Sequence, residues 1–131
     1  MRRSKRGQSL VEAVIGMVVI IPIGLAALDM VVFTQVAQQN EELVEMSARA
    51  AAQRGDQASA YKAVQDVVSR VQTSSVIQDV VIQNVTFDLA KGQVSVNTAM
   101  TVRVPVPLPW LSIVTCQASS VQPIVSTPAP I

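Results

Sequence analysis

The chain has 131 residues, half of them apolar, and a formal net charge of +1 at pH 7. Four of its ten basic residues lie in the first six positions, and the rest of the chain carries six basic against nine acidic residues, which excludes a basic nucleic-acid-binding surface. The absence of histidine and the single cysteine, Cys116, exclude histidine-based triads, histidine metal sites and paired-cysteine zinc or redox sites. We therefore expect one small domain with no enzymatic activity, no metal and no cofactor.

The N-terminus joins a basic segment to a long apolar one. Four basic residues precede Gly7, and from Ala13 to Phe33 the single charged residue is Asp29. These 21 residues would cover about 31 Å as a helix, close to the roughly 30 Å hydrocarbon core of a bilayer. We predict a transmembrane segment at about 13–33. Because basic flanks stay on the cytoplasmic side, the rest of the chain would lie outside.

Glu12 stands at the start of this apolar segment. A carboxylate beside an apolar helix is costly in hydrocarbon, which makes Glu12 a candidate functional residue. It follows Gln8 by four residues, which is about one helical turn. The alternative interpretation is a polar residue at the membrane interface without a specific role.

Pro22 and Gly24 lie inside the apolar segment. Proline removes a backbone hydrogen bond and tends to kink a helix, and membrane helices tolerate such breaks where neighbours satisfy the freed carbonyl. We expect a helix break at these two residues. An ordinary kinked membrane anchor explains them equally well.

The N-terminal helix is predicted to continue beyond the membrane and to cover residues 8–54. Apolar residues recur at helical spacing as far as Ala50, and Gly55 offers a C-cap. Asp56 is expected to cap a second helix that ends at about Gln72. The apolar face of this helix, which requires a packing partner, comprises Ala60, Ala63, Val64, Val67, Val68 and Val71.

After residue 75 the pattern changes from helical to alternating. Two alternating runs on either side of Lys91-Gly92 predict a β-hairpin. Its apolar positions are Val85, Phe87, Leu89, Val94, Val96, Met100, Val102 and Val104. We predict two further strands, at 76–82 and 111–121. The link from Pro105 to Trp110 cannot be a central strand, because proline lacks the ladder donor.

These elements predict an α+β fold in which a long transmembrane helix extends outside the membrane and a short helix packs on a small antiparallel sheet. The outer domain would cover 56–125, and the last six residues, 126–131, would form a flexible tail. Cys116 falls in the last strand and has no partner for an intrachain disulfide. It is either a small buried residue or the thiol of an intermolecular bridge.

The N-terminal pattern is similar to that of the type IV prepilin-like superfamily. The basic segment ending in Gly7 corresponds to the leader, 1–7, Gln8 to the first mature residue and Glu12 to the fifth mature position before the apolar helix. Within the superfamily, Arg-Gly-Gln-Ser-Leu-Val-Glu resembles the TadE-like minor pilins, or pseudopilins, of tight-adherence pili. The resemblance covers about the first 30 residues.

The resemblance implies a structural or assembly subunit of an extracellular pilus involved in adhesion or secretion. A prepilin peptidase would cut between Gly7 and Gln8, Glu12 would pair with the N-terminal amine of an adjacent subunit, and the helix would loosen near Pro22 and Gly24 on entering a filament. The implied partners are other pilin subunits, the inner-membrane assembly platform and membrane lipid. Before assembly, the protein would be a single-pass protein of the cytoplasmic (inner) membrane.

Two readings from other classes remain open. In the first, Leu10 to Leu25 is the apolar region of an ordinary signal peptide, with Gly24-Leu25-Ala26 as the cleavage site of a secreted soluble protein. Glu12 inside that region argues against it. In the second, the helix is an uncleaved anchor that displays the outer domain as a binding module, and Gly7 is coincidental.

Overall fold

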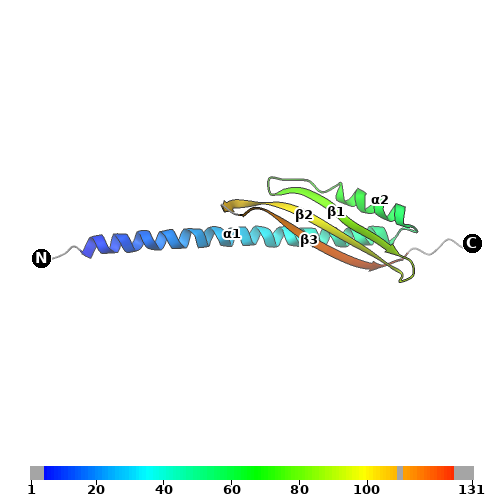
Figure 1. Ribbon diagram of the computed structural model, residues 1–131, viewed down its shortest axis with the longest axis horizontal. Helices are drawn as coiled ribbons and strands as arrows, with labels where there is room; N and C mark the ends of the chain where they lie inside the picture. The colour runs from blue at the N-terminus through cyan, green and yellow to red at the C-terminus, as the bar shows by residue number, and fades with distance from the viewer. Residues whose placement is uncertain (1–4, 109–110, 126–131) are drawn as a thin grey trace, which may run out of the picture.

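One helix, α1, runs from Lys5 to Ala52 and forms the long axis of the molecule (Figure 1). The computed structural model describes residues 5–108 and 111–125, so the predicted tail at 126–131 lies outside the described residues. α1 begins three residues before the predicted start and ends two before the predicted end, where the amide of Arg54 donates to the carbonyl of Ala51 at 3.0 Å. It continues through Pro22 and Gly24, so the helix break predicted at these residues is not present in the isolated chain.

The second helix, α2, runs from Gln57 to Val68 and therefore ends before the predicted Gln72. Its N-terminus is capped by Asp56, whose carboxylate accepts hydrogen bonds from the amides of Ala58 and Ser59, both at 3.1 Å. The amide group of Gln57 donates to the carbonyl of Val85 at 2.7 Å, and its oxygen accepts from the amide of Phe87 at 2.8 Å. Gln57 thereby joins α2 to the outer edge of the sheet.

Replacing Asp56 by Asn is expected to keep this cap and to reduce the dependence of stability on pH. The hydrogen bond from the Ser59 side chain, with that from its amide, lowers the pKa of Asp56 below its usual value of 3.8. Because the folded pKa is the lower one, the carboxylate stabilises α2 above about pH 4 and loses this effect as pH falls through the folded pKa.

Thermal unfolding of the full chain in detergent at neutral pH and at about pH 3 tests this prediction. Wild type should lose more thermal stability between the two pH values than Asp56→Asn, whose amide cannot titrate. Equal losses would show that Asp56 does not carry the effect, because all the other carboxylates are shared by the two proteins.

The sheet has three antiparallel strands in the order β1-β2-β3. β1 covers Ile77–Asp88, β2 covers Gln93–Leu108 and β3 covers Leu111–Pro123. The β1–β2 connection contains Gly92, whose φ of 62° is a left-handed conformation that glycine adopts without a steric cost. The turn predicted at Lys91-Gly92 therefore lies where the hairpin reverses.

Two details of the prediction for the first strand are wrong. The segments around 76–82 and 85–89 form one strand, β1, because register shifts between Ile77 and Asp79 and between Ile82 and Asn84 interrupt the alternation without ending the strand. Leu89 does not continue the inward face of β1. It follows the end of the strand, in the turn, and its side chain is 71% exposed.

The segment beginning at Pro105 is part of β2, the central strand, which the sequence excluded. The reason is that β2 is longer than its neighbour. β1 pairs with β2 only up to Val102, and pairing with β3 is interrupted between Arg103 and Leu108. The prolines therefore occupy a part of β2 where the ladder makes no demand on their missing amides. Residues 109 and 110 of the predicted link lie outside the described residues.

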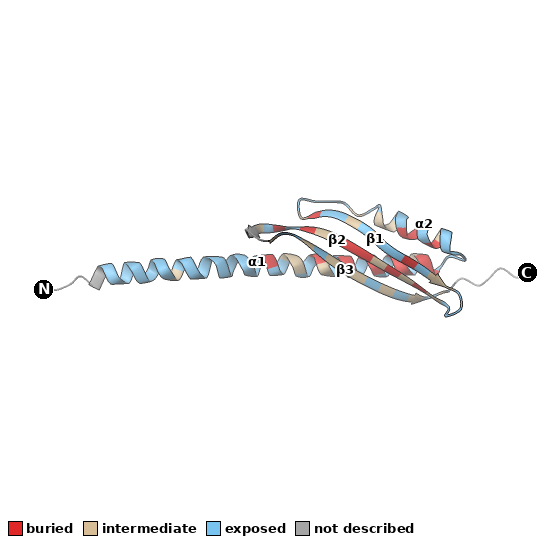
Figure 2. Ribbon diagram, viewed as in Figure 1, coloured by how far each residue is buried: buried red, intermediate tan, exposed pale blue. Residues whose placement is uncertain are grey.

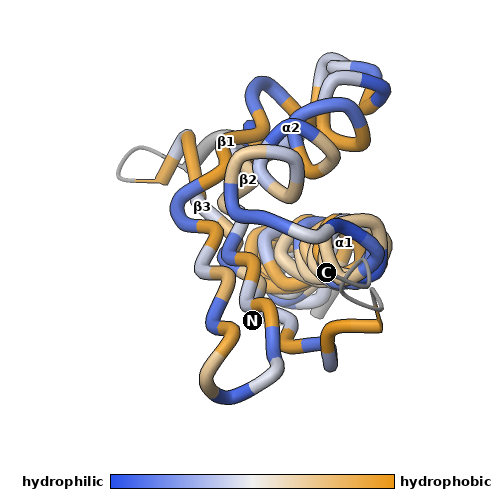
Figure 3. Tube along the Cα trace, turned by 90° about the vertical axis from the view of Figure 1, so that its right-hand side faces the viewer, coloured by the Kyte–Doolittle hydropathy of each residue, from blue (hydrophilic) through white to orange (hydrophobic). Residues whose placement is uncertain are grey.

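The core lies between the second half of α1, α2 and one face of the sheet (Figure 2). Viewed along α1, both helices lie on the same side of the sheet (Figure 3). Alternation along β2 is as predicted, since Val94, Val96 and Val102 are buried toward the helices and Arg103 is exposed. The partner for the apolar face of α2 is thus α1 together with β1.

Candidate functional site

No other part of the described chain packs against the first half of α1. From Gly7 to Leu28 every residue is exposed except Gly16, which is half-buried (Figure 2). Large apolar side chains point outward all round the helix, including Val14, Ile20 and Ile23. A helix that is apolar on every side is stable only in an apolar environment. By length and composition this one could cross a membrane.

The length of the uncovered segment matches a bilayer. From Gly7 to Asp29 the helix rises by about 33 Å, compared with roughly 30 Å of hydrocarbon. The predicted transmembrane range, about 13–33, includes Val32 and Phe33, which are half-buried and pack against the core. The uncovered stretch therefore begins and ends several residues earlier than that range, and it includes the polar residues Gln8, Ser9 and Glu12 at its start.

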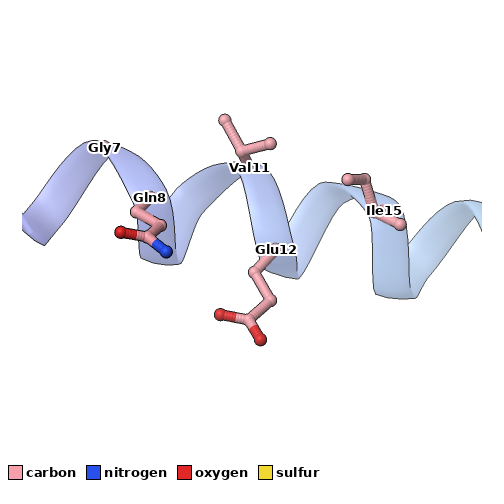
Figure 4. Close-up of a pocket in the computed structure, with 5 residues that line it drawn as sticks. All are labelled: Gly7, Gln8, Val11, Glu12 and Ile15. Atoms are coloured by element: carbon pink, nitrogen blue, oxygen red, sulfur yellow. The ribbon is translucent and has the colours of Figure 1, made fainter.

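Gly7, Gln8 and Glu12 lie together in the first turns of α1 (Figure 4). The side chains of Gln8 and Glu12 project from one side of the helix, and Val11 points to the other side (Figure 4). Together with Ile15 they line a shallow, open depression along a single helix. Within the described chain, Glu12 is exposed and takes part in no ion pair or hydrogen bond. The carboxylate is thus available to a group from outside the chain.

The bond between Gly7 and Gln8 lies near the start of the helix. In an α-helix the first four amides have no intrahelical partner, so the opening turn separates more readily than the interior. Glycine at this position lowers helix stability further. The predicted cleavage bond therefore lies in a turn that unwinds more readily than the interior of α1.

Asp29 marks the end of the uncovered segment, but it does not face solvent or lipid. Its side chain is 6% exposed, and Oδ1 accepts a hydrogen bond from the amide of Val106 at 3.2 Å. Val106 stands between Pro105 and Pro107, neither of which has an amide hydrogen to donate. The sequence marked Asp29 only as the single charge of the apolar segment, without a partner. The structure supplies the partner from a residue 77 positions away.

A buried polar network that sequence analysis missed joins α1 to the sheet. Asn40 and Thr98 are fully buried, and the Thr98 hydroxyl donates to Oδ1 of Asn40 at 2.8 Å. Nδ2 of Asn40 in turn donates to the carbonyl of Cys116 at 3.0 Å. One signal was present, because Asn40 lies on the same helical stripe as Val36 and Leu43, where an apolar residue is expected.

Cys116 is half-buried in β3, far from Glu12, and packs against the core cluster that contains Leu43 and Met100. Its thiol forms no disulfide within the described chain. The contacts agree with the interpretation of Cys116 as a small core residue. They place the thiol on the helix side of the sheet.

In residues 5–108 and 111–125 no group of three or more His, Cys, Asp or Glu side chains is arranged to hold a metal ion. The chemistry of the site is therefore that of one carboxylate on an apolar helix. Comparisons with protein-family models, with curated proteins and with solved structures found no match to this chain.

Proposed function

We propose that the chain is a pilin-like subunit that is stored in a membrane through the first half of α1 and then enters an extracellular filament. The observation that carries the proposal is the uncovered apolar segment with one carboxylate, Glu12, beside Gln8. Such a segment needs an apolar environment, and both lipid and a bundle of similar helices provide one.

The role proposed for Glu12 follows from the cost of burying charge. Cleavage after Gly7 would create an α-amine on Gln8, one helical turn from the carboxylate. In the membrane, the amine lies at the boundary and the carboxylate about one turn inside it, where its side chain can reach interfacial water. In a bundle of packed helices each charge would be desolvated, and pairing between adjacent subunits would offset that cost. Glu12 would thus favour the assembled state over lipid.

The resemblance of the first 30 or so residues supports a more specific proposal, a TadE-like minor pilin or pseudopilin of tight-adherence pili. The partners would then be a prepilin peptidase, other pilin subunits, membrane lipid and the inner-membrane assembly platform. The basic residues before Gly7 favour a cytoplasmic N-terminus, with the sheet and α2 outside.

An uncleaved single-pass anchor is the second candidate. The fit between the uncovered segment and the bilayer supports it equally, because that fit does not depend on processing. It leaves the coincidence of Gly7 and Glu12 without an explanation.

Intact mass and N-terminal sequencing of the protein from membranes of its own host separate these readings. We expect a mature chain that begins at Gln8. A chain that begins at Ala27 would establish an ordinary signal peptide, and one that retains residues 1–7 would establish the uncleaved anchor. Gly7→Glu, which changes only the residue before the cut, should accumulate uncut in the membrane.

A further inference from the structure

We propose that the end of the β2–β3 hairpin nearest Asp29 contacts the outer surface of the membrane and forms a second attachment beside α1. This hairpin end is defined here as Pro105, Val106, Leu111, Ser112 and Ile113. The inference rests on the membrane span in the proposed function, but not on cleavage or filament assembly.

The first argument is position. β2 and β3 extend beyond the end of β1 toward the N-terminal half of α1 (Figure 1). The hydrogen bond from the amide of Val106 to Asp29 holds the hairpin end beside α1, at the residue that directly follows the uncovered segment. If Gly7 is near the cytoplasmic boundary, Asp29 lies about 33 Å above it, at the opposite boundary of the hydrocarbon. The hairpin end is then level with the lipid headgroups.

The second argument is composition. Ile113 is 53% exposed, Pro105 is exposed, and Val106 and Leu111 are half-buried. From Val104 to Cys116 the sequence has no charged residue. The other end of the sheet is different, since Asp88 and Lys91 form an ion pair there with Nζ and Oδ2 3.7 Å apart. The sheet thus has an apolar end toward the span and a charged end away from it.

The third argument concerns backbone amides. A loop that approaches hydrocarbon must satisfy its polar backbone groups, because lipid tails provide no hydrogen-bond partners. Pro105 and Pro107 have no amide hydrogen, and the amide between them, on Val106, is already bonded to Asp29. This end of β2 therefore presents few unsatisfied donors to the membrane, although it lies beyond the β1 ladder.

The nearest cationic side chain to the hairpin end in the sequence, Arg103, is placed where it could contact lipid headgroups. Arg103 is exposed two residues before Pro105, and with Val104 and Ser112 it lines a small surface depression beside that proline. A guanidinium at this height can donate to lipid phosphate while the residues ahead of it enter the interface. A second contact of this kind would restrict tilting of the outer domain relative to the membrane surface.

A tryptophan moved onto the described hairpin end provides the measurement. Trp110→Phe with Leu111→Trp keeps one tryptophan in the chain and places it on β3, within the hairpin end. The full chain would be reconstituted in phosphatidylcholine vesicles with bromine near the headgroup end of the acyl chains, and separately with bromine near the chain ends. We expect at least about twofold quenching by the first lipid, less by the second, and protection from aqueous iodide, as for an interfacial tryptophan.

Two substitutions on one face of β3 make a matched pair. Ile113 and Val121 are 53% and 54% exposed, at opposite ends of the strand. Ile113→Asp should reduce quenching by the brominated lipid and increase quenching by iodide, whereas Val121→Asp should change neither. Hydrogen exchange of β2 amides would show that both variants retain the sheet.

Three outcomes would overturn the inference. Strong quenching by iodide with none by brominated lipid would place the hairpin end in water. Shielding from both quenchers would show that a second protein copy covers it. Equal effects of the two substitutions would show that the position on β3 is irrelevant. Flotation with the vesicles separates these results from failure of the proposed function, because a chain that does not float has no span.

Discussion

Glu12→Gln is expected to be almost absent from filaments while its membrane level and cleavage remain close to normal. The substitution leaves the apolar segment intact and removes the charge that would pair with the α-amine of a neighbouring Gln8. Loss of one partner from a buried ion pair costs roughly 3–5 kcal/mol. A cost of that size reduces the population of the assembled state by at least about a hundredfold.

The measurement is the ratio of filament-associated to membrane-associated protein, or of protein that co-isolates with other pilins. Glu42→Gln is the matched control, because it makes the same chemical change on an exposed part of the same helix and outside any ion pair of the described residues. Gly7→Glu serves as the reference for uncut protein, so that a Glu12→Gln chain that has not been cleaved can be recognised by its mass. Wild-type incorporation of cleaved Glu12→Gln would mean that the carboxylate is only an interfacial residue.

Asn40→Leu is expected to destabilise the outer domain by roughly 2–4 kcal/mol. The substitution keeps a similar volume but leaves the buried Thr98 hydroxyl without its acceptor and the Cys116 carbonyl without the Nδ2 donor. Each such loss costs about 1–3 kcal/mol, which is a large fraction of the 5–15 kcal/mol typical of a domain.

This cost can be measured by urea unfolding of the full chain in lipid nanodiscs, with hydrogen exchange of β2 and β3 amides as the readout. These amides report on the outer domain and not on the membrane-spanning segment. Thr98→Val should cost less, because Asn40 retains its bond to Cys116. The double variant should be more stable than the sum of the two changes predicts, by about 1 kcal/mol. Additive effects, or a cost of Asn40→Leu below about 0.5 kcal/mol, would show that the network does not hold α1 to the sheet.

Local patterns predicted the helices and the hairpin because their causes are local. Asp56 and its two amide donors lie within three residues of each other, and Gly92 by itself permits the turn. Boundaries were less accurate. The sequence pattern placed the end of α2 at Gln72, whereas the helix ends at Val68 and is followed by turns in which the amides of Arg70 and Val71 bond three residues back.

The strand errors have a different cause. A simple alternation cannot detect a bulge, so the two register shifts in β1 made one strand look like two. Proline at 105 excludes a fully paired central strand, and it is compatible with β2 only because β1 ends earlier. The length of a neighbouring strand is a property of the sheet and cannot be read from the residues around Pro105.

In the candidate site, too, local groupings could be predicted from the sequence and long-range contacts could not. Gly7, Gln8 and Glu12 are adjacent in the sequence, so their grouping on the first turns of α1 follows directly from helical geometry. The partners of Asp29 and Asn40 are 77 and 58 residues away, and only the folded arrangement of strand against helix brings them together. From the sequence, Asp29 was marked only as the single charge of the apolar segment and Asn40 was not considered, so neither contact was identified.

The contact of the sheet with α1 from Asp29 to Ala52 has a mechanical consequence. No flexible linker separates the uncovered segment from the outer domain, since one continuous helix belongs to both. A pulling force on the sheet would therefore reach the uncovered segment directly, along about 36 Å of shared helix. The weakest point for bending is Pro22, where the carbonyl of Val18 has no proline amide to bond. Bending there would tilt the outer domain as a rigid unit and leave its core undisturbed.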